Sequence, residues 1–216
     1  MPYYPVYLDL AGRACAVIGG GHLAEEKVRG LLAAGAMVRV VAPELTPGLA
    51  ELAAAGGIDH LPRAFEPGDL DGVFLAFTAG EAPATVEAVW DEARRAKVLL
   101  NTVDDVPHCD FIMPSILRRG DLTIAISTAG RAPALAVRLR ECLEGVVGPE
   151  HARFLELAGA VRAPLARRWP DFATRRELWY RLVDSDVLAL LRQGDEEAAV
   201  ARFHEIMDVT PAEAVA

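Results

Sequence analysis

The apolar residues of the first hundred positions follow two alternating patterns, short continuous runs and a spacing of three to four residues. Short apolar runs are typical of buried strands, and the longer spacing is typical of helices. The runs predict strands at residues 13–18, 37–41, 73–77 and 98–100. The spacing predicts helices from Ala24 up to Gly35, at 46–55 with Thr46 as N-cap, and at 84–96. Apolar strands separated by helices indicate an α/β fold, a Rossmann-like, doubly wound parallel sheet with right-handed crossovers.

Beyond Gly148 only the helical spacing continues. Phe154, Leu157 and Val161 recur at intervals of three and four residues, which is the period of an amphipathic helix. Helices are predicted at residues 151–169, from Arg175, from Asp184 and at residues 196–207. The chain is therefore expected to end in a helical region.

The composition of the chain limits the classes of protein to which it can belong. Its 216 residues, 52% hydrophobic and 25% charged, are typical of a globular protein. Its formal charge of -9 argues against nucleic acid as a partner, because phosphates require a basic surface. We expect neither a secretory leader nor a membrane span, since no apolar stretch reaches about 18 residues. The cysteines form no C-x-x-C pair, which favours the reducing cytoplasm; they are Cys15, Cys109 and Cys142.

A glycine-rich turn joins the first predicted strand to the first helix, with the pattern G-x-G-x-x-A. Glycine allows a tight turn and a close approach of the backbone to a pyrophosphate, and the helix N-terminus supplies N–H groups and a positive dipole end. The sequence therefore predicts a dinucleotide site, although a tight turn without a ligand is the alternative. The residues expected to contact the cofactor here are Gly19, Gly21, His22 and Leu23.

The end of the second strand departs from the usual dinucleotide-binding pattern. Ala42 stands where an acidic residue would hold the adenine ribose, and Pro43 and Glu44 follow it. Pro43 and Glu44 are the candidates for that contact. No arginine follows within four residues to hold a 2′-phosphate, so NAD is favoured over NADP.

Two carboxylates follow the apolar run 98–100, where the strand is expected to pass into a loop. Ligands of open α/β sheets bind at the carboxyl ends of the strands, so Asp104 is a candidate general base and Asp105 a neighbour that shifts its pKa. An Asx-type turn is the alternative role for both residues. Further cofactor contacts are expected from strand ends, namely Thr78, Asn101, Thr102 and Val103.

Several short motifs occur in the order found in one enzyme family. They are residues 5–8, Gly19-Gly20-Gly21 with Ala24 and Lys27, and residues 40–43, 101–105, 111–115 and 127–133. Together they resemble the precorrin-2 dehydrogenase and sirohydrochlorin ferrochelatase family, the N-terminal part of sirohaem synthase. The resemblance implies oxidation of the tetrapyrrole precorrin-2 to sirohydrochlorin with NAD, in some members with insertion of ferrous iron. It also implies a homodimer and a functional aspartate at Asp104.

The resemblance suggests three parts and a free-standing form without a methyltransferase domain. The parts are an NAD-binding Rossmann domain at 1–113, a middle dimerisation segment at 114–147 and a helical C-terminal domain at 148–216. Residues 118–140 contain five arginines and one aspartate, a local basic patch for a substrate with many carboxylates. Arg131 and Arg138, seven residues apart, are expected to share a helical face, and Thr128 precedes the turn into that helix. Solvated helix charges are the alternative.

Signals for a resident metal are weak. His108 and Cys109 are adjacent, but no H-x-x-x-H or C-x-x-C pattern supports a permanent site, so no metal ligand is predicted. Ferrous iron is expected only as a transient substrate. A different class of function also fits the sequence, a non-catalytic NAD-binding sensor that uses its helical tail for partners.

Overall fold

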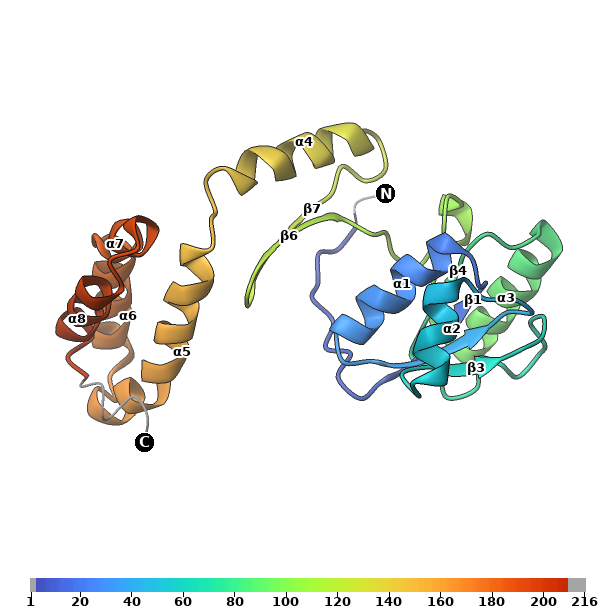
Figure 1. Cartoon of the computed structure of the whole chain (residues 1–216), viewed down its shortest axis with the longest axis horizontal. Coiled ribbons are helices and arrows are strands. Elements are labelled where there is room, and N and C mark those ends of the chain that lie inside the picture. The colour runs from blue at the N-terminus through green and yellow to red at the C-terminus, as the bar shows by residue number, and fades with distance from the viewer. Residues whose placement is uncertain (1–2, 210–216) are drawn as a thin grey trace. The chain divides into compact units, whose positions relative to one another are not determined.

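The computed structural model describes residues 3–209, which divide between Met113 and Pro114 into two compact units (Figure 1). Residues 210–216 of the predicted C-terminal domain lie outside this range. The predicted division into three parts stays a prediction.

The first unit contains a five-stranded parallel sheet. Its strands are β1 (Ala14–Ile18), β2 (Met37–Val41), β3 (Asp59–Leu61), β4 (Leu75–Thr78) and β5 (Leu99–Thr102). Their order is β3-β2-β1-β4-β5, so the chain reverses direction across the sheet between β1 and β4. Such a reversal is the point where open α/β sheets bind ligands. The predicted Rossmann-like doubly wound fold is confirmed.

Helices cover both faces of this sheet (Figure 1). Helices α1 (His22–Ala33) and α2 (Pro47–Ala54) pack against one face, where Val17 and Phe77 are buried. Helix α3 (Pro83–Ala96) packs against the other face, on Ala76 and Leu100. Because side chains alternate between the faces of a strand, a residue two positions after Ala76 or Leu100 also faces α3.

The predicted cap of α2 is confirmed, because the Thr46 hydroxyl accepts a hydrogen bond from the Leu49 N–H at 3.2 Å. The predicted end of the strand at residues 98–100 is wrong. That strand does not stop at Leu100; β5 continues through Asn101 and Thr102, which are buried and pair with the last residues of β4. The prediction ended the strand where its side chains become polar, but the backbone hydrogen bonds to the neighbouring strand continue beyond that point.

The second unit begins with a hairpin that the sequence pattern did not show. Strands β6 (Ser115–Arg119) and β7 (Leu122–Ile126) pair antiparallel across a turn in which Gly120 has φ +55°. Five helices follow: α4 (Pro133–Glu144), α5 (Glu150–Arg168), α6 (Phe172–Val183), α7 (Val187–Gln193) and α8 (Glu196–Met207). Helices α5 to α8 enclose their own core, centred on residues such as Val161, Leu182 and Phe203. None of the helices within residues 3–209 is long and apolar enough to cross a membrane.

Candidate functional site

The three glycines between β1 and α1 have different physical roles. Gly19 has φ +121°, and a Cβ atom there would lie 2.3 Å from the Ala79 carbonyl oxygen. A Cβ atom on Gly20 would lie 1.9 Å from the Glu44 carbonyl oxygen. Gly21 is the N-cap of α1, without a side-chain cap, and a Cβ atom there would meet nothing within 4 Å of the described residues. The first two glycines therefore permit close packing, and the third leaves the helix N-terminus open to an anion.

The first turn of α1 presents two exposed residues to this opening. His22 and Leu23 are exposed, and Leu23 is 44% accessible although apolar. The acidic residue of the same turn is already paired: Glu25 accepts hydrogen bonds from the Thr46 hydroxyl at 2.5 Å and from Arg29 Nη2 at 2.6 Å. These bonds hold the pKa of the Glu25 carboxyl below its ordinary value. Its charge is therefore balanced within the protein rather than directed at a ligand.

The segment after β2 is attached to the glycine turn. The Thr46 N–H donates to the Gly20 carbonyl at 3.0 Å, and the Glu44 carbonyl lies against Gly20. Pro43 and Glu44 are exposed at this position. The structure thus brings together two of the stretches in which cofactor contacts were predicted, the glycine turn and the segment after β2.

A pocket of about 230 Å³ lies at the carboxyl ends of β4 and β5. Thr78 and Thr102 occupy the last paired positions of these strands and follow Ala76 and Leu100 by two residues, so both face α3. They are 1% and 5% exposed, yet the hydroxyl of neither has a hydrogen-bond partner within the described residues. Buried hydroxyls are rarely left unpaired in proteins, so two that line one pocket suggest that a ligand pairs them.

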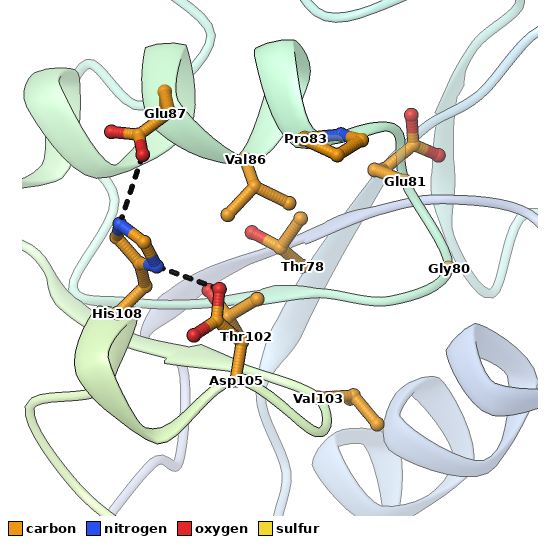
Figure 2. Close-up of a pocket in the computed structure, with 10 residues that line it drawn as sticks. All are labelled: Thr78, Gly80, Glu81, Pro83, Val86, Glu87, Thr102, Val103, Asp105 and His108. Carbon is orange, nitrogen blue, oxygen red and sulfur yellow. Dashed lines mark hydrogen bonds and ion pairs between the residues drawn. The ribbon is translucent and has the colours of Figure 1, made fainter.

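The same pocket is lined by ionisable groups from α3 and from the 3-10 helix η1 (Val106–His108) (Figure 2). His108 Nδ1 lies 2.6 Å from Asp105 Oδ2, and its Nε2 lies 3.4 Å from Glu87 Oε1. The hydrogen bond to Asp105, assisted by the charge of Glu87, raises the pKa of His108. Burial raises the pKa of the Glu81 carboxyl, which lines the pocket beside Gly80.

Replacing Asp105 with Asn is expected to lower the pKa of His108 towards its ordinary value, because the largest cause of its elevation is removed. NMR titration of the imidazole C–H resonances measures this shift. A folded-state pKa above the unfolded value near 6.5 stabilises the protein fully below about pH 6.5, and the gain is lost as the pH rises through the folded pKa. The variant should therefore lose stability relative to the parent below that pH but not well above it. An unchanged His108 titration would contradict the pairing.

Asp104 and Asp105 have different environments. Asp104 is exposed, with φ +63°, in a turn closed by the Asp105 N–H donating to the Thr102 carbonyl at 3.3 Å. Aspartate is one of the few residues that tolerate this backbone region. Asp105 lines the pocket, whereas Asp104 is not among its lining residues. Both the catalytic and the turn interpretation of Asp104 stay predictions.

Asn101 lies on the opposite face of β5 from Thr102, and its carboxamide nitrogen has protein partners. It donates to the Phe111 carbonyl at 2.8 Å and to Cys109 Sγ at 3.5 Å. Cys109 Sγ in turn donates to the Thr102 carbonyl at 3.2 Å, and burial raises the pKa of this thiol. Asn101 and Cys109 therefore brace the loop after β5. Within residues 3–209, no group of three or more His, Cys, Asp or Glu side chains is placed to hold a metal ion.

The predicted substrate contacts belong to the second unit. The Thr128 hydroxyl accepts a hydrogen bond from the Ala132 N–H at 3.2 Å. Arg131 is exposed in the turn before α4, so the expectation that Arg131 and Arg138 share a helical face is wrong. The residues 129–130 between Thr128 and Arg131 have positive φ, which turns the chain before the helix begins. Arg138 is exposed on α4 and forms an ion pair with Glu141 at 2.7 Å.

Sequence reasoning did not identify two ionisable residues of the pocket, Glu81 and Glu87, and it considered His108 only as a weak metal-site candidate, not as the partner of Asp105. The spacing of Asp105 and His108, three residues apart, is a weak signal for their contact. Glu87 is distant from both in sequence, and only the packing of α3 beside η1 brings its carboxylate to the imidazole.

Three family models match successive parts of the chain. Residues 6–115 match the model described as "Putative NAD(P)-binding". Residues 119–145 match "Sirohaem biosynthesis protein central", and residues 151–207 match "Sirohaem synthase dimerisation region".

Relatives with curated names match nearly all of the chain. It is 39% identical over 199 residues to the siroheme synthase of Photobacterium profundum, covering 92% of this chain and 42% of that protein. It is 40% identical over 200 residues to siroheme synthase 3 of Aeromonas hydrophila, covering 92% and 43%. The chain thus spans less than half the length of these relatives. A solved structure titled "SirC, precorrin-2 dehydrogenase" is similar with a TM-score of 0.76 and 25% identity, covering 95% of this chain and 99% of that one.

Proposed function

The chain belongs to the family of the N-terminal, NAD(P)-binding part of sirohaem synthase, and on this premise we propose that it is an NAD-dependent precorrin-2 dehydrogenase of sirohaem biosynthesis. The observation that carries the proposal is the similarity to the SirC structure over nearly the full length of both chains.

The residues present fit a bound dinucleotide. The open N-terminus at Gly21 suits a pyrophosphate, and Thr78 and Thr102 offer unpaired buried hydroxyls at the carboxyl ends of neighbouring strands. Exposed Glu44 is the candidate acceptor for the adenine ribose hydroxyls. Because no arginine follows β2 within four residues, we propose NAD rather than NADP.

Oxidation of a reduced tetrapyrrole removes a hydride and a proton. The cofactor, when bound, supplies the hydride acceptor. Asp104, an exposed carboxylate after β5, takes the proton as general base. Arg131 and Arg138 bind carboxylates of the substrate through their guanidinium groups, and Thr128 lies at the turn before them. Further cofactor contacts come from Gly19, His22, Leu23, Pro43, Asn101 and Val103.

The second unit supports an assembly proposal. Because residues 151–207 match a dimerisation region, we propose that the chain forms a homodimer. We also propose that it acts in the cytoplasm, where sirohaem biosynthesis would supply the substrate. Ferrous iron is proposed only as a second substrate, in a chelatase step that follows oxidation.

An anaerobic assay tests the function. Purified protein with NAD and precorrin-2 is expected to give sirohydrochlorin absorbance together with NADH, and a parallel reaction with ferrous iron tests the chelatase step. The absence of sirohydrochlorin would refute the dehydrogenase. If the protein bound NAD without turning over precorrin-2, the sensor function would replace it.

A further inference from the structure

The pocket beside Thr78 adjoins the glycine turn. A Cβ atom on Gly19 would lie 3.3 Å from Glu81 Oε1, and Glu81 lines the pocket. The pocket and the turn therefore lie next to each other along the carboxyl edge of β1, β4 and β5. A dinucleotide with its pyrophosphate at the N-terminus of α1 has this pocket beside it.

The lining of the pocket, here called its wall, has mostly acidic residues among its ionisable groups. Three carboxyl groups, those of Glu81, Glu87 and Asp105, line the pocket together with the His108 imidazole, and the ten described residues of the lining include no lysine or arginine. The formal charge of this lining is negative whether His108 is counted as neutral or as protonated. Such a wall repels the carboxylates of a tetrapyrrole and attracts a cation.

The hydroxyl groups of the pocket add a second requirement. Thr78 and Thr102 are adjacent in the strand register, and neither hydroxyl has a partner among residues 3–209, so they can pair with a group that donates and accepts hydrogen bonds at neighbouring atoms. Figure 2 shows the Thr78 side chain within the lining, between Val86 and Thr102. A planar carboxamide attached to a cationic ring meets both requirements.

We propose that this pocket binds the nicotinamide end of the cofactor and selects its oxidised form. The two threonine hydroxyls pair with the carboxamide, and the acidic wall attracts the pyridinium ring, whose positive charge is lost when it accepts a hydride. The overall equilibrium of the reaction is unchanged, but the product NADH leaves the pocket more readily and is replaced by NAD⁺. The inference rests on the proposed NAD-dependent function and names the residues that set its preference.

Calorimetric titration with NAD⁺, NADH and ADP-ribose tests the two contributions separately. ADP-ribose carries the pyrophosphate but no nicotinamide. Thr78→Val and Thr102→Val are expected to weaken NAD⁺ and NADH binding each by about threefold to tenfold, the usual effect of one lost hydrogen bond, and to leave ADP-ribose binding unchanged. Thr85→Val is the matched control, because Thr85 lies on α3 outside the pocket lining.

A second variant tests the contribution of the acidic wall to NAD⁺ binding. Glu87→Gln is expected to weaken NAD⁺ binding by about threefold and NADH binding not at all, because Glu87 is exposed and partly screened by solvent. Asp91→Asn, one turn further along α3 and outside the lining, is the matched control. If wild-type protein bound NADH as tightly as NAD⁺, or if Glu87→Gln weakened both equally, the selection would be refuted.

Thermal unfolding without ligand gives a second readout. Thr78→Val is expected to leave the Tm unchanged or raise it, because the variant removes a buried hydroxyl that has no partner in the described part of the chain. A lower Tm, or an equal loss of ADP-ribose affinity, would show a structural role and overturn the assignment. If none of the three ligands bound to the wild type, the proposed function itself would fail, whereas binding that is insensitive to both threonines refutes only the pocket.

Discussion

Replacing Gly21 with aspartate is expected to weaken dinucleotide binding severely while the protein stays folded. A Cβ atom at this position meets nothing within 4 Å among the described residues, and aspartate is a favourable N-cap that stabilises α1 by a few tenths of a kcal/mol relative to glycine. Its carboxylate, however, occupies the open helix N-terminus and repels a pyrophosphate there. Calorimetry should show at least about a hundredfold weaker NAD⁺ binding, equivalent to about 2.7 kcal/mol.

Variants at two further glycines serve as controls for the added charge and for its position. Gly30→Asp adds the same charge on α1 away from its N-terminus, at an exposed site with nothing within 4 Å, and should leave binding unchanged. Gly20→Ala places a methyl group 1.9 Å from the Glu44 carbonyl oxygen, so it should destabilise the fold by about 2 kcal/mol. Normal NAD⁺ affinity in a folded Gly21→Asp protein would remove the glycine turn from the cofactor site.

Replacing Asp104 with asparagine is expected to lower the rate of precorrin-2 oxidation by about a hundredfold, because general-base catalysis typically contributes that much or more. Asparagine tolerates the φ of +63° at this position, so the variant removes the charge without straining the turn. Alanine tolerates this backbone less well and would combine both effects. The measurements are the initial rate at saturating NAD⁺ and the NAD⁺ affinity, which should not change.

Asp71→Asn serves as the control for Asp104, since Asp71 is an exposed acidic residue of the same unit outside the pocket. Its rate should equal that of the parent. An Asp104→Asn protein with full activity would leave Asp104 as a turn residue and favour another base. Loss of activity together with loss of NAD⁺ affinity would instead indicate a role in cofactor binding.

The strands that could be predicted were those with continuous apolar runs. Residues 37–41 form β2 with the predicted bounds, because a run rich in β-branched residues covers the whole strand. Strand β3 was missed, since its three residues Asp59, His60 and Leu61 have no apolar run and are extended only by pairing with β2. The hairpin of β6 and β7 was missed for a similar reason, because pairing across Gly120 rather than local apolarity defines it.

The sequence by itself determined the parallel sheet, the glycine turn before α1 and the helical character of residues beyond 148, since each follows from the order and spacing of residue types along the chain. Only the tertiary structure decided that His108 contacts both Asp105 and Glu87, and that Thr78 and Thr102 lie side by side without a hydrogen-bond partner among the described residues. Those relations depend on the register of β4 with β5 and on the packing of α3, which join residues far apart in sequence. Local pattern fixes which face of an element is buried, whereas the partners that meet there are set by packing between elements.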